Sequence, residues 1–228
     1  MALTAYHTGL RAVHNNNNVT LENYLRVEPN VNSVWNACVH IITNRSSDDS
    51  PDSNTLLSIL NIRFPTAASS WSISPEAYPK PESTTGRQAD LLVRRMLFAG
   101  IPDPERTAWV AYEGKGGDSD YTWTKIQRQL LDFLVDSVGQ ADGAVCWAIG
   151  TKGRKVRFWR YTAKYTGWEK MVPVFIDGNG NISNTDQNKG KAIGDTAPDG
   201  LCLDIITNWA SVARLVNVIF TQAAREEP

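Results

Sequence analysis

Three residues near the middle of the chain have the types and spacing of a hydrolytic metal site. Asp90 opens one apolar run, and Glu113 and Lys115 close a second one, separated by a single glycine. Residues two positions apart share one face of a strand. Carboxylate oxygens suit Mg²⁺ or Mn²⁺, and a nearby amine can neutralise charge that develops on a phosphate. The set therefore suits metal-assisted phosphodiester hydrolysis, although a Glu-x-Lys triplet at a strand end is also a common surface ion pair.

The two runs predict an antiparallel hairpin that would bring these residues together. Residues 91–98 and 107–112 are rich in strand-forming side chains, and a Gly/Pro turn lies between them. In an antiparallel pair the start of one strand faces the end of the next, so we expect Asp90 beside Glu113. A literal Pro102-Asp103 pair falls in the turn, at the far end of the hairpin from Lys115, and is excluded on that ground.

The order of these motifs resembles that of the PD-(D/E)xK nuclease superfamily, the proteins with the restriction-endonuclease-like fold. The resemblance covers about residues 86–162, and the runs that carry it are 90–93, 111–115, 129–133, 146–150 and 156–159. It implies that Asp90 is the acidic residue at the start of the second core strand and that Glu113 and Lys115 form the (D/E)xK motif. It also implies a catalytic role for Gln129 on the next helix, followed by the aromatic Phe133. The implied activity is cleavage of nucleic acid with Mg²⁺ or Mn²⁺ held by Asp90 and Glu113.

A helix is expected over residues 121–138, ended by Gly139. Its apolar stripe is Trp123, Ile126, Leu130, Phe133 and Leu134. On a wheel of 100° per residue Gln127 lies nearer this stripe than Gln129, whereas the family pattern favours Gln129. Both assignments stay open, and either side chain could be an ordinary surface glutamine.

The remaining elements predict an α/β protein with a mixed central β-sheet flanked by helices, and the resemblance implies that its core is restriction-endonuclease-like. The expected strands are residues 70–74, 144–150, 155–161 and 171–176, and the second is apolar enough to be buried on both faces. Residues 177–181 predict a hairpin turn, and helices are expected at 21–27, around 34–42, and at 201–224. Residues 1–228 are interpreted as one domain, with a flexible arm at 1–18 and the nuclease-like core at 86–162. Glu22 is the candidate for an additional acidic residue that the family often takes from an N-terminal helix.

A basic, aromatic segment follows the helix. Between residues 152 and 170 seven basic side chains accompany one acid, with Tyr161, Tyr165 and Trp168 interleaved. Such a segment can follow a phosphate backbone and stack bases, and its candidate contacts are Lys152, Arg154, Arg157, Arg160 and Trp168. The equally weighted alternative is a solvated sheet face whose aromatic residues lie in the core.

Composition limits the function without naming it. The 228 residues carry a net charge of −1, so no strong basic excess indicates nucleic acid, although local patches can bind it. Residues 1–20 have no apolar core typical of a signal peptide, no later run is long enough to predict a membrane span, and Cys38, Cys146 and Cys202 lack metal-ligand spacing. We therefore expect an intracellular protein with reduced thiols and no membrane partner. The resemblance implies that its partner is nucleic acid, either DNA or RNA. A protein partner or a homodimer stays open, as does the alternative of a non-catalytic binding or effector-like module on the same fold.

Overall fold

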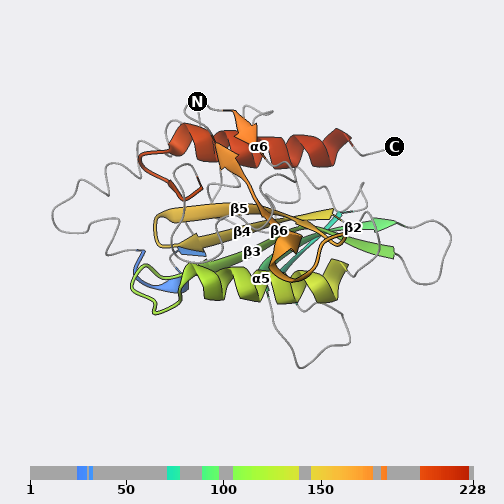
Figure 1. Cartoon of the computed structure of the whole chain (residues 1–228), viewed down its shortest axis with the longest axis horizontal. Coiled ribbons are helices and arrows are strands. Elements are labelled where there is room, and N and C mark those ends of the chain that lie inside the picture. The colour runs from blue at the N-terminus through green and yellow to red at the C-terminus, as the bar shows by residue number, and fades with distance from the viewer. Residues whose placement is uncertain are drawn as a thin grey trace, which may run out of the picture.

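A mixed β-sheet forms the centre of the computed structural model (Figure 1). The structure describes residues 25–29, 31–32, 71–77, 89–97, 105–138, 145–176, 181–183 and 201–225. The strands of the sheet are β1 (Trp71–Ala77), β2 (Ala89–Leu97), β3 (Glu105–Lys115), β4 (Val145–Lys152), β5 (Lys155–Thr162), β6 (Met171–Pro173) and β9 (Leu203–Asp204). Their order is β1-β2-β3-β4-β5-β6, and β9 pairs with the opening of β5.

The sheet is antiparallel except at its centre. β3 and β4 run parallel, and helix α5 (Trp123–Val138) makes the crossover between them. All other neighbouring strands are antiparallel. The α/β class and the mixed sheet expected from the sequence are confirmed. The ends of β3 and β4 that follow Glu113 and Gly150 lie side by side, and the carboxyl ends of parallel strands are where α/β sheets commonly bind ligands.

Two helices cover opposite faces of the sheet. In Figure 1 α6 (Trp209–Arg225) lies above the sheet and α5 lies below it. Side chains from alternate positions of the same strands enter separate cores. Val110, Tyr112 and Phe158 pack on the α6 side, whereas Ala111 and Trp159 pack on the α5 side. This alternation decides which face each polar residue of β3 and β5 can reach.

Helix α5 forms where the amphipathic pattern predicts it. The predicted stripe is buried at all five of its positions, and Gln127 and Leu131 are buried with it. The backbone N–H of Lys125 donates to Thr122 Oγ1 at 3.2 Å, so Thr122 caps the helix. The helix therefore begins two residues after the expected start, at Trp123.

Several strand predictions are confirmed with small shifts. β1 overlaps the expected 70–74 strand but continues through Pro75 to Ala77, which is compatible with its position at the edge of the sheet. β4 is buried over six consecutive positions, as its apolar sequence predicts. The expected 171–176 strand is split into β6 and β7 (Phe175–Ile176), and β7 pairs with β8 (Ile182–Ser183) across the predicted hairpin turn.

The C-terminal helix begins later than expected. The sequence predicted a helix from Leu201, but residues 203–204 form β9 and the helix begins at Trp209. The reason is local: Asp204 Oδ1 accepts hydrogen bonds from the backbone N–H groups of Ile206 and Thr207, which favours a turn there. A short 3₁₀ helix, η1 (Gly167–Lys170), precedes β6. The predicted arm at 1–18, Glu22, Cys38 and the 98–104 turn lie outside the described residues. Within the described ranges, no helix is both long and apolar enough to span a bilayer.

Candidate active site

The β2–β3 register brings Asp90 and Glu113 to the same end of the hairpin. Leu91 pairs with Tyr112, so the next position outward places Asp90 beside Glu113. The backbone N–H of Gly114 donates to Asp90 Oδ2 at 2.7 Å. Strand alternation directs Glu113 and Lys115 to the same face as Ala111, which is the face that α5 covers. The antiparallel pairing and the proximity of the two acids are therefore as the sequence predicts, while their catalytic roles stay predictions.

Lys115 is enclosed by two carboxylates. Its Nζ lies 2.7 Å from Glu113 Oε1 and 3.2 Å from Glu28 Oε2, and 5.0 Å from the centroid of the Tyr121 ring. Glu113 is 2% exposed and Lys115 is 7% exposed. A surface ion pair at a strand end would be far more accessible. The Glu-x-Lys triplet is therefore an internal ion pair, in which a fixed ammonium is held between two acids.

Sequence reasoning missed Glu28. Glu28, Pro29, Val31 and Asn32 are helical, and the Val31 N–H donates to Val27 O at 3.2 Å. Pro29 is the signal that could have placed the start of this turn, because proline is favoured at the first positions of a helix. The helix expected over 21–27 predicted that Glu22 would be the additional acidic residue of the site. The acid that the N-terminal segment contributes, among the described residues, is Glu28.

Asn32 connects this segment to both strands of the hairpin. Its Nδ2 donates to Asp90 Oδ2 at 3.3 Å, and its Oδ1 accepts from the Tyr112 hydroxyl at 3.0 Å. The same hydroxyl lies 2.9 Å from Thr151 Oγ1 on β4. A chain of polar contacts thus runs from the N-terminal segment through β2 and β3 to β4. Through Asn32, these contacts link the Asp90 carboxylate to β3 and β4.

Burial shapes the electrostatics of the site. Burial and, to a smaller extent, the neighbouring charge of Asp90 raise the pKa of Glu113, Lys115 opposes both effects, and the net pKa is about 7. Burial likewise raises the pKa of Asp90, against the hydrogen bond from Gly114 and the charge of Lys115. For Lys115 burial lowers the pKa, but Glu113, Asp90 and Glu28 outweigh it and the net pKa is raised. The ammonium therefore stays charged while Glu113 is partly protonated near neutral pH.

The donor set fits a hard divalent cation. Three carboxylates surround one ammonium, so full ionisation leaves an excess of negative charge in a largely buried site. A cation there would offset that excess. Among the described residues no three His, Cys, Asp or Glu side chains form a ready-made metal cage. Mg²⁺ commonly uses one or two carboxylates and completes its shell with water and phosphate oxygens, and Asp90 with Glu113 would provide such a pair.

The two glutamines of α5 differ from the family pattern. Gln127 is 1% exposed, and neither of its amide atoms has a hydrogen-bond partner in the described part of the chain. Gln129 is only half-buried, and its Oε1 is also without such a partner. The wheel argument for burial of Gln127 is confirmed. Within the described residues no hydrogen bond joins either glutamine to the carboxylates or to Lys115, so a catalytic role for Gln129 stays a prediction.

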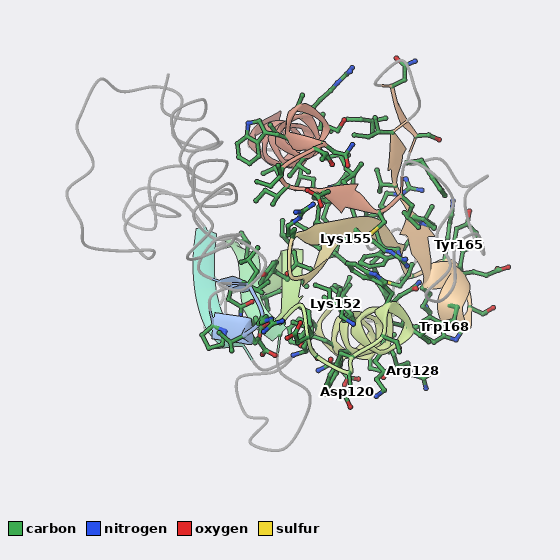
Figure 2. The ribbon with its side chains drawn as sticks, turned by 90° about the vertical axis from the view of Figure 1, so that its left-hand side faces the viewer. Asp120, Arg128, Lys152, Lys155, Tyr165 and Trp168 are labelled. Atoms are coloured by element: carbon green, nitrogen blue, oxygen red, sulfur yellow. The ribbon has the colours of Figure 1, made fainter. Side chains whose placement is uncertain are left out.

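The basic segment after α5 is only partly available to a ligand. Arg157 is 1% exposed and its guanidinium lies 4.4 Å from the centroid of the Trp123 ring. It shares the α5-side face with Trp159 and Tyr161, so the expected phosphate contact of Arg157 does not fit its position. Arg154 pairs with Asp204, and the half-buried Arg160 also has interactions within the protein. Trp168 packs against the α5-side core, with the Arg128 guanidinium 5.5 Å from its ring (Figure 2).

Lys152 keeps an accessible position among the predicted contacts. It is half-buried at the end of β4, and its Nζ donates to Tyr121 O at 2.8 Å. Lys155, which was part of the basic segment but not among the selected contacts, is exposed at the opening of β5. Lys152 and Lys155 therefore place accessible positive charge at the β4–β5 turn, and the buried Arg157 is not part of that surface.

Comparison with protein-family models, with curated proteins and with solved structures finds no match to this chain.

Proposed function

We propose that the protein is a divalent-metal-dependent nuclease that hydrolyses phosphodiester bonds, built on a PD-(D/E)xK core. The observation that carries the proposal is the convergence of Asp90, Glu113 and Lys115 at the carboxyl end of the central parallel strands. Burial of the Glu113–Lys115 pair supports a functional interpretation, since a buried ion pair contributes little net stability by itself. The order of an acid-bearing strand, a Glu-x-Lys strand, a helix and a further strand supports the family assignment.

Each residue of the site has a chemical role in this proposal. Asp90 and Glu113 would hold Mg²⁺ or Mn²⁺, which supplies positive charge for the phosphate and makes a water more acidic. Lys115 has its ammonium positioned by Glu113 and Glu28, so it can donate to a phosphate oxygen or orient the attacking water without losing its charge. Asn32 and the Gly114 N–H hold the Asp90 carboxylate in place.

The direct test is a cleavage assay with single- and double-stranded DNA and RNA, with Mg²⁺ or Mn²⁺ and then with excess chelator. Cleavage by the wild type should disappear on chelation and in the Asp90→Asn and Glu113→Gln variants. Asp136→Asn, which removes an exposed carboxylate from α5, is the matched control and should cleave normally. Circular dichroism would show that each variant is folded.

The contrary result is also well defined. A folded wild type that cleaves none of these substrates and shows no calorimetric binding of Mg²⁺ or Mn²⁺ would overturn the nuclease proposal. The alternative, a non-catalytic binding module on the same fold, would then account for the buried charges as structural.

A further inference from the structure

A cationic pocket lies next to the carboxylate site. It has a volume of about 520 Å³, within the usual size range for sites that bind small ligands. The N-terminal segment, the loop after β3 and the β4–β5 turn contribute its walls, and Trp123 contributes at the start of α5. Four basic and two acidic side chains line it, a net charge of +2: Arg26, Lys152, Arg154, Lys155, Asp118 and Asp204.

Two of the four basic side chains are already paired with the acids. Arg26 Nε lies 2.9 Å from Asp118 Oδ2. Arg154 donates two hydrogen bonds to Asp204 Oδ2, from Nη2 at 2.6 Å and from Nε at 2.8 Å. The positive excess of the pocket therefore resides on Lys152 and Lys155. Lys152 uses one N–H for the Tyr121 carbonyl, which leaves two donors on its ammonium.

The two lysines are direct cross-strand partners. Lys152 pairs with Lys155 across the tight β4–β5 turn, where Gly153 adopts a φ of +56°. Like charges directly opposite each other destabilise an antiparallel pair. Figure 2 looks onto this end of the molecule and shows both lysines there, Lys152 nearer to α5 and Lys155 further toward α6. An anion held between the two ammonium groups would relieve this repulsion.

The pocket and the carboxylate site share their walls. The Gly153 N–H donates to Lys115 O at 2.9 Å, and the Gly117 N–H donates to Leu25 O at 2.7 Å. Lys115 and Lys152 are register partners in the parallel pair. The segment that brings Arg26 to the pocket continues to Glu28 at the carboxylates. The carboxylate site and the cationic pocket thus lie side by side at one end of the sheet.

We infer that this pocket holds a backbone phosphate, with its sugar, of the nucleotide that flanks the bond to be cleaved, and that Lys152 and Lys155 make the phosphate contacts. The inference rests on the proposed function, because it places a second phosphate of the same strand beside the carboxylates. Contacts of this kind read charge and position, so they would be independent of sequence. The pocket would align the strand so that the next phosphate meets Asp90, Glu113 and Lys115.

The test measures oligonucleotide binding without any divalent metal, so that it does not depend on cleavage. A labelled single-stranded DNA is titrated with wild type, with Lys152→Gln/Lys155→Gln, and with Lys164→Gln as the control. Lys164 is exposed beyond β5 and lies over the Tyr165 ring, away from the pocket lining. The double variant should bind more weakly and lose about one unit of salt slope per lost phosphate contact, whereas the control should match the wild type.

A neutral methylphosphonate, moved one linkage at a time along the strand, sharpens the result. With an oligonucleotide only as long as the binding site, so that one register is possible, one position should weaken binding to the wild type and leave the double variant unaffected, because that phosphate is the one the pocket holds. Thermal unfolding would verify that both variants are folded. If the double variant does not fold, the single variants Lys152→Gln and Lys155→Gln provide the same comparison.

The two proposals fail differently. A wild type that cleaves nucleic acid, together with a double variant whose affinity, salt slope and KM are unchanged, would overturn the pocket and leave the nuclease intact. Lysine-dependent, methylphosphonate-sensitive binding by a protein that cleaves nothing would overturn the nuclease and retain the pocket as a phosphate site.

Discussion

The backbone N–H of Gly114 donates to the Asp90 carboxylate across the β2–β3 pair, while the Asn32 side chain approaches the other side of the same glycine. A Cβ at position 114 would meet Asn32 Oδ1 and would lie 2.6 Å from the Tyr112 hydroxyl. The glycine between Glu113 and Lys115 is therefore a requirement of packing. It lets the N-terminal segment reach the acids that the hairpin presents.

Gly114→Ala should destabilise the protein and weaken the site together. The added methyl group must displace Asn32 and its hydrogen bonds, and overpacking of this kind costs about 1–3 kcal/mol. Urea unfolding measures the loss of stability. Gly117→Ala is the control, since its nearest contact would be Leu25 O at 3.3 Å, and it should lose less. Equal stability of wild type and Gly114→Ala would contradict the described position of Asn32.

Glu113→Gln should stabilise the protein at alkaline pH. The pKa of Glu113 is raised from 4.5 to about 7, so the folded protein takes up a proton between these values. Protonation of Glu113 in the folded protein therefore adds to the free energy of unfolding. This contribution is fully present below the pKa of Glu113 in the unfolded chain and is lost as pH rises through about 7. Glutamine removes the buried negative charge, and Lys115 keeps Glu28 as a partner.

Unfolding experiments at about pH 5 and about pH 8 test this sign. The gain of the variant over the wild type should be larger at the higher pH, with an upper limit on the order of 3 kcal/mol. Asp136→Asn, at an exposed position of α5, should show little difference between the two conditions. A variant that is instead less stable at the higher pH would show that the ionised carboxylate supports the fold.

Binding of Mn²⁺ should tighten as pH rises through about 7. A metal ligand must be deprotonated, and the raised pKa of Glu113 means that the proton competes with the metal below that value. Calorimetry across this range, with proton release measured in buffers of different ionisation enthalpy, provides the check. Glu113→Gln should bind weakly and lose the dependence, and a wild-type affinity that does not change with pH would count against Glu113 as a ligand.

The hairpin and the Asp90–Glu113 proximity could be predicted because they depend on local patterns. Two strand-like runs around one turn predict the antiparallel pairing, and alternation along β3 predicts the face that Glu113 and Lys115 share. The one-residue register shift between Val93 and Arg94, which aligns Asp90 with Glu113 and not with Tyr112, has no such local signal. The stripe of α5 follows from the same kind of periodicity. Each of these inferences needs only residues that are close in sequence.

Glu28 could not be predicted in the same way. Its position depends on the contact between Asn32 and Tyr112, which are 80 residues apart, and no local pattern specifies that pairing. The glycines at 114 and 116 were the available hint, since a Cβ at 116 would meet Arg26 O. Small residues beside an active-site motif indicate that another segment approaches closely.

The sequence contained a signal for the burial of Arg157, but the number of basic residues around it favoured the prediction of a phosphate contact. Arg157, Trp159 and Tyr161 alternate along β5, so they share a face, and two aromatic residues indicate that this face is buried. The prediction assumed that the seven basic residues of this segment lie on one surface. The structure divides them between a core face, paired positions and the β4–β5 turn.

Arg157→Ala should therefore lower stability and should leave the salt slope of oligonucleotide binding unchanged. It removes a buried side chain whose guanidinium lies 4.4 Å from the Trp123 ring centroid, and large-to-small replacement in a core costs about 2–5 kcal/mol. Arg157→Met retains much of the volume without the charge and should lose less stability, because a buried charge contributes little net stability once its site is filled.

Arg128→Ala, at an exposed position of α5, is the control for the loss of one positive charge. Urea unfolding and metal-free titrations at several salt concentrations measure the two effects separately. If Arg157→Ala kept its stability but lost about one unit of salt slope, Arg157 would be a phosphate contact after all, and the face under α5 would have to open when nucleic acid binds.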